Sequence, residues 1–236
     1  LYGLKDKEKI ELQPSKPIIE GNDDYLSVSY SSFSSFDIFA KLSIKAQDDK
    51  LIISCEIDNQ SSLDVVEILM PHISGLYLGS NDKIVYPHHA GEITTNPVLE
   101  YGKNRKEFWR AASVPVDSYY RREINYCGLA SMSWMYYYSK DNGIYIASHD
   151  PSYPVTGVIA ETSGDEENPW MAFGFRKYER IRKGEQKTSK EYVIAISKED
   201  WHYGARIYRE YIAPFLSFAP SPEFLKDEVA LNQCYN

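Results

Sequence analysis

The sequence predicts an all-β fold, an antiparallel β-sandwich (supersandwich-like) with one C-terminal amphipathic helix. Segments rich in Ile, Val, Phe and Tyr recur between residues 25 and 196 and are separated by short polar breaks, as in antiparallel sheets. After residue 197 the hydrophobic residues recur at steps of four, three and four, which is a helical period. The 236 residues fall within the size range of one large all-β domain.

The strand pattern can be followed along the chain. Strands are expected at 25–30, 36–44, 51–57, 64–70, 83–86, 133–138, 144–147, 155–160, 170–178 and 192–196. Pro71 is expected to end the fourth of them. Residues 87–107 lack a regular period and predict a long loop, a kind of connection that is often functional or mobile.

The most distinct local signal is Lys140-Asp141-Asn142-Gly143, which lies between two strand-like segments. Asn-Gly in this position favours a primed turn, because both central residues of such a turn must accept a positive φ. The sequence therefore predicts a β-hairpin here. Asp48 and Asp49 predict a second tight turn between strands, because Asp side chains cap their own backbone in turns.

The helical period predicts a closing helix at 198–213 whose buried stripe consists of Trp201, Ala205, Tyr208 and Ile212. Ser197 is expected to be its N-cap, within a capping box. Pro214 should end the helix, since proline disfavours the helical conformation of the residue before it. This divides the chain into a sandwich domain at 1–213 and a segment at 214–236 that reads as a linker and the start of a further domain.

Composition restricts the partners. The formal net charge of −8 argues against nucleic acid, which needs a concentrated positive surface, and favours a neutral or weakly polar ligand. The sequence contains no apolar run of about 18 residues, so no membrane partner is expected. The three cysteines lack the spacing of a zinc site or a disulfide framework. No metal and no cofactor are predicted.

Trp170 is the first candidate for a carbohydrate-binding residue. It follows the acidic segment 161–168, and a flat apolar ring beside hydrogen-bonding groups is a usual way to hold a polar ligand with an apolar face. Ordinary packing within the sandwich is the alternative for this ring. The acidic segment itself reads as a solvated turn, with a calcium site or a catalytic carboxylate pair as the other possibilities.

His149, Asp150 and His88 complete the set of candidates. His149 and Asp150 follow the hairpin strand directly and could reach a sugar hydroxyl at the rim of the sheet. Alternatively, Asp150 forms a turn with Pro151 while His149 packs. His88 precedes His89 in the irregular segment, and adjacent residues of an extended chain point in opposite directions, so at most one of them faces a given site.

Several motifs together resemble a known family. They are a strand that ends in Asn59, the segment Met70-Pro71-His72-Ile73-Ser74-Gly75-Leu76, the hairpin strand that leads to His149-Asp150, and Trp201 to Arg209. From about residue 36 to 222 the chain resembles the N-terminal region of large bacterial glycoside hydrolase-like proteins. In these, a galactose-mutarotase-like β-supersandwich precedes a (β/α)-barrel. The resemblance implies a catalytic barrel as the partner domain, with its carboxylates beyond Asn236.

Three functions follow as hypotheses. The first is a non-catalytic or substrate-shaping sandwich of a carbohydrate-active enzyme, whose catalytic residues are not in this chain. The second is a free-standing carbohydrate-binding module that uses exposed aromatic rings. The third is a mutarotase-type sugar epimerase, which needs a His acid and a carboxylate base on one concave face, with His88 or His149 and Glu161 as the candidates. A start at Leu1 instead of Met would fit a removed signal peptide and a secreted, periplasmic or cell-surface location.

Overall fold

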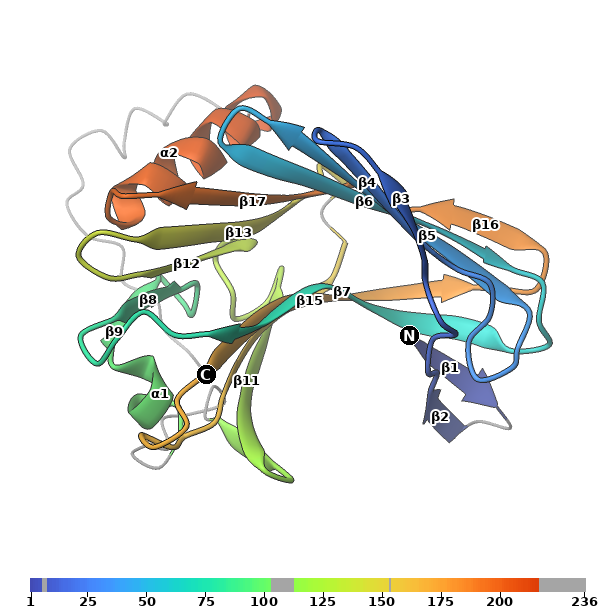
Figure 1. Ribbon diagram of the computed structural model, residues 1–236, viewed down its shortest axis with the longest axis horizontal. Coiled ribbons are helices and arrows are strands. Elements are labelled where there is room, and N and C mark those ends of the chain that lie inside the picture. Colours follow the sequence, from blue (N-terminus) through green and yellow to red (C-terminus); the bar gives the residue numbers. More distant parts are fainter. Residues whose placement is uncertain (6–7, 103–112, 153, 217–236) are drawn as a thin grey trace, which may run out of the picture.

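A computed structural model gives the structure of the protein and describes residues 1–5, 8–102, 113–152 and 154–216. Within these residues, seventeen strands form two antiparallel sheets that face each other, and a helix closes the chain on the outside of one of them (Figure 1). The predicted all-β sandwich with one C-terminal helix is confirmed. No helix among the described residues is long and apolar enough to span a membrane.

The seven-stranded sheet has a continuous antiparallel order. It runs β10 (Val114–Val116), β11 (Tyr119–Tyr126), β14 (Thr156–Thr162), β15 (Met171–Ile181), β7 (Asp64–Leu76), β1 (Tyr2–Lys5) and β2 (Glu8–Glu11). Figure 1 shows that this sheet arches, with β11 and β1 bending away from the other sheet on either side of β7 and β15.

The ten-stranded sheet forms the other layer. Its order is β3 (Ile18–Gly21), β4 (Tyr25–Tyr30), β5 (Ile38–Gln47), β6 (Lys50–Asn59), β17 (Glu191–Ser197), β13 (Gly143–His149), β12 (Trp134–Tyr138), β8 (Lys83–Tyr86) and β9 (Glu92–Thr95). The tenth strand, β16 (Glu185–Thr188), also pairs with β6. A short helix, α1 (Pro97–Glu100), follows β9.

The main core lies between the two sheets and is rich in aromatic rings. Phe173 and Phe175 of β15 meet Tyr137 and Tyr192 of the ten-stranded sheet, and all four are at most 2% exposed. Burial of one such ring stabilises the fold by about 1.5–3 kcal/mol relative to leaving it in water. Strand alternation decides which residues take part, so every other residue of β14 and β11 faces outward instead.

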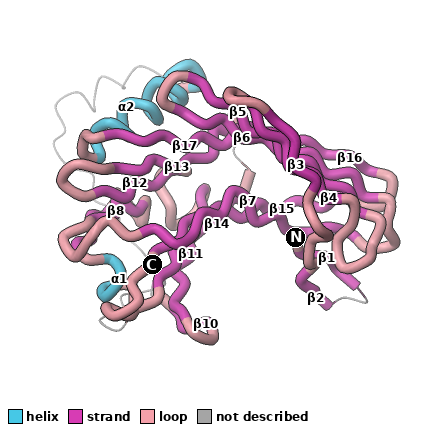
Figure 2. Tube along the Cα trace, viewed as in Figure 1, coloured by secondary structure: helices cyan, strands magenta, loops and turns pink. Residues whose placement is uncertain are grey.

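Helix α2 (Trp201–Ile212) covers the outer face of the ten-stranded sheet at β12, β13 and β17 (Figure 2). Its Ile207 and Tyr208 pack on Trp134, Tyr136 and Tyr145 in a second apolar cluster. The helix is closed by a 3-10 turn at Ala213–Phe215.

The predicted N-cap of this helix is wrong. The helix begins at Trp201, three residues after the predicted start, because the Asp200 carboxylate accepts the amide N–H of His202 at 3.0 Å. The Ser197 hydroxyl instead accepts the N–H of Glu199 and forms a separate turn. Asp200 and Ser197 are both good N-cap residues, and the helix begins after Asp200, which lies nearer to the apolar residues of the helix.

Three further sequence predictions need correction. β7 continues through Pro71 to Leu76, since the proline lies in a β-bulge where it loses no ladder bond. The segment 87–107 is not one long loop, because β9 and α1 form within its described part. The hairpin between β12 and β13 is confirmed, but a four-residue loop closes it and neither Asn142 nor Gly143 has a positive φ.

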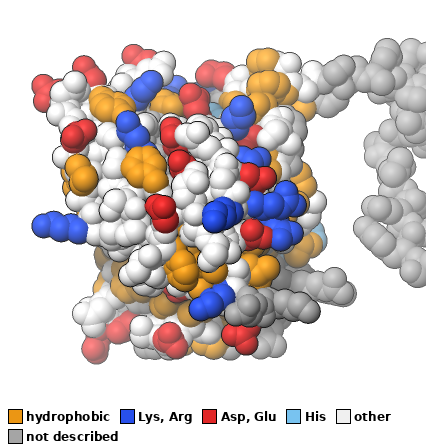
Figure 3. Space-filling model, turned by 90° about the vertical axis from the view of Figure 1, so that its right-hand side faces the viewer, with side chains coloured by type: hydrophobic (Ala, Val, Ile, Leu, Met, Phe, Trp, Pro, Cys, Tyr) orange, Lys and Arg blue, Asp and Glu red, His pale blue; other side chains and the backbone are white. Residues whose placement is uncertain are grey.

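The side of the molecule that carries β3, β5 and β16 has a mixed surface. Figure 3 shows acidic and basic side chains interleaved on the described part of this face, with hydrophobic side chains in separate groups between them. The negative net charge is therefore not concentrated on this side. Of the cysteines, Cys55 is buried and Cys127 is exposed, whereas Cys234 lies outside the described residues.

Gly204 offers a test of how α2 docks. A Cβ at this position would lie 2.8 Å from Tyr136 Cδ2 and 2.9 Å from Tyr145 Cδ2. We expect Gly204→Ala to destabilise the protein by about 1–2 kcal/mol, because overpacking exceeds the gain in helix propensity. Urea unfolding measures this, with the solvent-facing Glu210→Ala as a control. Unchanged or increased stability of Gly204→Ala would contradict the close packing.

Candidate functional site

Polar side chains gather on the outer face of the seven-stranded sheet. In β11, Arg122 and Ile124 face the interior, so Arg121 points outward. In β14, Val158 and Ala160 belong to the core, so Glu161 points outward as well. Arg121 and Glu161 are direct cross-strand partners in the register of the two strands. A carboxylate and a guanidinium group are thus side by side on this face.

A bulge in β7 adds a third residue. Ile68 and Met70 belong to the core, and strict alternation would also turn His72 inward. However, Leu69 to His72 of β7 lies opposite Arg176 to Gly174 of β15, so β7 carries one extra residue here. This extra residue turns His72 to the outer face, where it is exposed, and Ile73 packs against the core instead.

Glu161 lies between the other two side chains. Arg121 Nε donates to Glu161 Oε1 at 2.6 Å, and Glu161 Oε2 lies 2.9 Å from His72 Nε2. The Glu161 side chain is only 5% exposed, whereas that of His72 is 31% exposed. We call Arg121, Glu161 and His72 the carboxylate clamp. Its imidazole is the member that a ligand reaches most easily.

Small residues on β15 allow this contact across a strand. β15 runs between β14 and β7, and it places Ala172 opposite Glu161 and Gly174 opposite His72. A Cβ on Gly174 would lie 3.0 Å from His72 Cδ2 and from the Pro71 carbonyl oxygen. A longer side chain at either position would stand between the carboxylate and the imidazole.

The clamp keeps Glu161 ionised. Burial raises the pKa of this carboxyl, but the hydrogen bonds from His72 and Arg121 outweigh burial and hold the pKa below its usual value. A carboxyl with a lowered pKa accepts hydrogen bonds well and is a poor general acid at neutral pH. Both of its oxygens already serve Arg121 and His72, so its first role is to orient these two side chains.

Aromatic rings extend the clamp. Arg121 Nη2 donates to the Tyr119 hydroxyl at 3.0 Å, and the Tyr119 ring lies 6.0 Å from the ring of Trp170. Ser163 fixes the backbone of Trp170 through two hydrogen bonds. Beside Tyr119 is an open depression of about 550 Å³, whose lining includes Tyr119, Ser163 and the acidic residues of 165–167 but not Trp170.

A second polar cluster lies on the same face. Arg176 donates to Glu67 at 2.7 Å and to Glu123 at 2.9 Å, and Lys9 also reaches Glu67 at 3.0 Å. Hydrogen bonds from Arg176 and Lys9 outweigh the burial that raises the pKa of Glu67, and this pKa is lowered. These charges satisfy one another, so the second cluster holds strands β7, β11 and β15 together.

His149 and Asp150 lie elsewhere. The His149 ring stacks on Tyr211 of α2 with centroids 4.0 Å apart, and its Nε2 is 3.0 Å from the Tyr145 hydroxyl. Asp150 accepts from the backbone and hydroxyl of Ser152 in a turn, and its other oxygen is 3.4 Å from Lys177. These contacts match the alternatives in which His149 packs and Asp150 forms a turn.

His88 is enclosed near one end of the sandwich. It is 8% exposed, and its Nδ1 lies 3.2 Å from Glu92, which also pairs with Arg122. The Arg122 guanidinium lies 4.6 Å from the ring centroid of Tyr86 and 4.8 Å from that of Tyr101. The structure therefore brings only Trp170, of the four predicted site residues, next to the carboxylate clamp.

The sequence does not predict the carboxylate clamp, for reasons that differ between its residues. The sequence places Glu161 in an acidic turn and offers His88 or His149 as its partner, whereas its partner in the structure is His72. Arg121 lies in a strand that was not predicted. The tyrosines and the isoleucine within 119–126 could have indicated this strand, because aromatic and β-branched residues favour strands. Within the described residues, no three His, Cys, Asp or Glu side chains are arranged to hold a metal ion.

The burial of His149 generates a pH prediction. Burial lowers the pKa of His149 from 6.5 to about 4. The unfolded chain therefore binds the extra proton between pH 6.5 and 4, and the native state loses up to about 3 kcal/mol of stability as the pH falls through this range. We expect His149→Gln, which cannot titrate and keeps an acceptor for Tyr145, to show a flatter stability profile in urea unfolding.

The control for this measurement is Ile196→Ala, because Ile196 is exposed and carries no titratable group. Its profile should run parallel to that of the unsubstituted protein. Equal slopes for the unsubstituted protein and His149→Gln between pH 6.5 and 4 would contradict the buried neutral imidazole.

Comparisons with known proteins show which solved structures have a similar fold. The sequence matches no protein-family model, and no curated protein matches it. A solved structure from Escherichia coli K12, assigned as an aldose 1-epimerase, is similar with a TM-score of 0.55 and 11% identity over 84% of this chain and 79% of that one. An α-N-acetylgalactosaminidase of Bifidobacterium bifidum in complex with GalNAc is similar with a TM-score of 0.56 and 11% identity.

A GH36 α-galactosidase of Geobacillus stearothermophilus in complex with raffinose is similar with a TM-score of 0.51 and 9% identity. The two glycosidase matches cover 91% and 89% of this chain but only 33% and 32% of those chains. This chain thus corresponds to about a third of each glycosidase. The protein therefore has the galactose-mutarotase-like β-sandwich fold that its sequence resemblance indicated.

Proposed function

We propose that this chain is a non-catalytic or substrate-shaping β-sandwich domain of a carbohydrate-active enzyme, and that a catalytic barrel outside residues 1–236 is its partner. We propose further that it contacts carbohydrate through the outer face of the seven-stranded sheet. The observation that carries this proposal is the position of His72 and Arg121 on either side of the ionised Glu161, with aromatic rings beside them.

The chemistry of this face fits a neutral sugar. Glu161 neutralises Arg121, so the carboxylate clamp offers fixed hydrogen-bonding groups with little net charge. Trp170 and Tyr119 offer ring faces for the apolar side of a pyranose. A few fixed polar groups beside apolar rings are the usual composition of a site for a small polar molecule. The sugars named for the two similar glycosidases, GalNAc and raffinose, are neutral as well.

Glycoside hydrolysis needs more than this face supplies. That reaction uses two carboxyl groups, and one of them must be kept protonated as the acid. The pKa of Glu161 is lowered instead, against the effect of burial, by its bonds to His72 and Arg121. This supports a binding or positioning role for this face, and in the proposal the hydrolytic carboxylates belong to the partner barrel.

A sugar epimerase is the second candidate, because a histidine and a carboxylate do meet on one face. Epimerisation needs the acid and the base on different atoms of the sugar. In this protein Glu161 and His72 are bonded to each other at 2.9 Å, which leaves no space for a sugar between them. The likeness to the E. coli protein supports the fold of this candidate and not its reaction.

Titration calorimetry with D-galactose, GalNAc and raffinose tests the binding proposal. We expect at least one of these sugars to bind and Trp170→Ala to raise its Kd about tenfold, because one ring contact is lost. Tyr77→Ala is the matched control, since Tyr77 is a 43% exposed aromatic residue outside the clamp. Glu161→Gln should also weaken binding, because Arg121 and His72 lose their common anchor.

Two results would contradict the proposal. One is the absence of binding of all three sugars to the unsubstituted protein. The other is a Trp170→Ala variant that binds as well as Tyr77→Ala. Polarimetry of freshly dissolved α-D-galactose in the same samples separates the candidates, since accelerated anomer interconversion between pH 5 and 8 would favour the epimerase. A native protein mass well above 27.2 kDa would support the partner barrel.

A further inference from the structure

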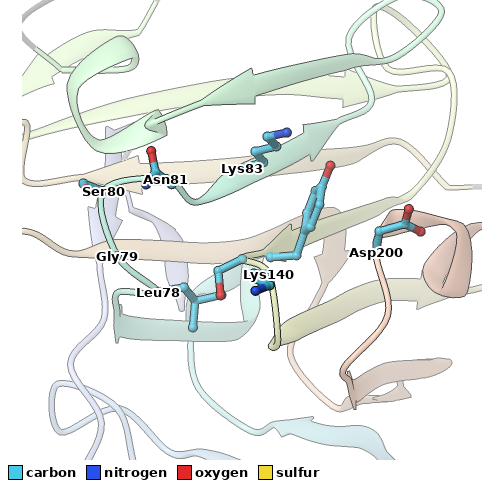
Figure 4. Close-up of a pocket in the computed structure, with 9 residues that line it drawn as sticks. Leu78, Gly79, Ser80, Asn81, Lys83, Lys140 and Asp200 are labelled. Carbon is cyan, nitrogen blue, oxygen red and sulfur yellow. The ribbon is translucent and has the colours of Figure 1, made fainter.

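A second depression opens on the other sheet, away from the carboxylate clamp. It has a volume of about 540 Å³ and lies where the loop before β8, the hairpin loop after β12 and the start of α2 meet. Figure 4 shows the loop from Leu78 to Asn81 on one side, Asp200 on the other, and Lys83 and Lys140 between them.

The ring of Tyr138 forms part of the lining. Tyr138 of β12 is the direct cross-strand partner of Lys83 of β8, so both side chains are on the same face of the sheet. Tyr138 packs beside the aromatic cluster under α2, and its ring lies 5.6 Å from that of Tyr136. The ring is therefore held in place at the edge of the depression.

The depression has two free positive charges. Among the described residues, no acidic side chain lies within ion-pair distance of Lys83 or Lys140. Asp200 also lines the depression, but its carboxylate accepts the N–H of His202 and lies 2.9 Å from the His202 ring. These two lysines place positive charge in one hollow of a chain whose net charge is −8.

The wall of the depression is fixed from inside the protein. Asp82 is fully buried and bonds to the Tyr137 hydroxyl, which in turn accepts the N–H of Leu78 at 3.2 Å. The N–H of Asp82 also donates to the Gly79 carbonyl oxygen at 3.1 Å and closes a turn. These bonds hold the loop at 78–82 in one conformation. A ligand would meet a preformed surface, so the free-energy cost of ordering this loop on binding would be small.

We propose that this depression is a second ligand site, which binds a saccharide that carries a carboxylate. The two lysines would hold the carboxylate through charge-assisted hydrogen bonds, and the face of Tyr138 would contact the sugar ring. Ser80, Asn81 and Ser139 add hydroxyl and amide groups for the sugar hydroxyls. The site is independent of the clamp, which lies on the other sheet and would take a neutral sugar.

The test compares D-galacturonate with D-galactose and inorganic phosphate by NMR titration of the backbone amides. We expect D-galacturonate to shift the amide signals of residues 78–83 and 138–140, and D-galactose to leave them unchanged. The double variant Lys83→Gln/Lys140→Gln should raise the Kd for D-galacturonate at least about tenfold. Added salt should weaken this binding, since the lysines are exposed.

The matched control is Lys45→Gln/Lys190→Gln, which removes two exposed lysines that do not line the depression. It should bind D-galacturonate as the unsubstituted protein does. The proposal is overturned if D-galacturonate shifts no signals there, or if both double variants bind it equally. Binding of phosphate as tight as that of D-galacturonate would show a general oxyanion site and would overturn the assignment to a saccharide. Loss of neutral-sugar binding in Trp170→Ala leaves this test unaffected.

Discussion

The carboxylate clamp on the outer face of the seven-stranded sheet is organised around one buried negative charge, that of Glu161. Glu161 is almost fully removed from water, and an ionised carboxylate in such a place needs partners that compensate for its lost hydration. Arg121 supplies a charge from the neighbouring strand, and His72 supplies a hydrogen bond from two strands away. The orientation of both exposed groups follows from this carboxylate. Removing it would leave a cation and an imidazole without a common anchor.

Local features of the sequence serve this arrangement. The bulge at Pro71 turns His72 outward. Because Ala172 and Gly174 of β15 have small side chains or none, the side chains of Glu161 and His72 can meet across this strand. Residues that look irregular or weak for a strand, a proline and a glycine, are therefore required by the site. A glycine has a comparable role under α2, where the missing side chain of Gly204 lets the helix approach two tyrosine rings.

Much of the fold could be predicted from sequence. The alternation in β4 to β8, in β12 to β15 and in β17, and the helical stripe after residue 200, are strong local signals that predict the sandwich and its closing helix. The strands β1 to β3, β9, β10 and β16 have at most four residues each, which is too short for a clear alternation. The site was harder, because Glu161 and His72 are 89 residues apart and a bulge decides on which face His72 lies. Trp170 could be proposed from sequence because it follows an acidic segment, which is a local feature.

The most direct test is a ¹³C NMR titration of the Glu161 side-chain carboxyl. The carboxylate clamp predicts a pKa below the usual value of about 4.3, and a rise of this pKa when His72→Leu or Arg121→Met removes a donor while burial remains. A pKa of Glu161 at or above the usual value in the unsubstituted protein would contradict the clamp. Such a result would mean that burial dominates and that Arg121 and His72 are not held by a shared carboxylate.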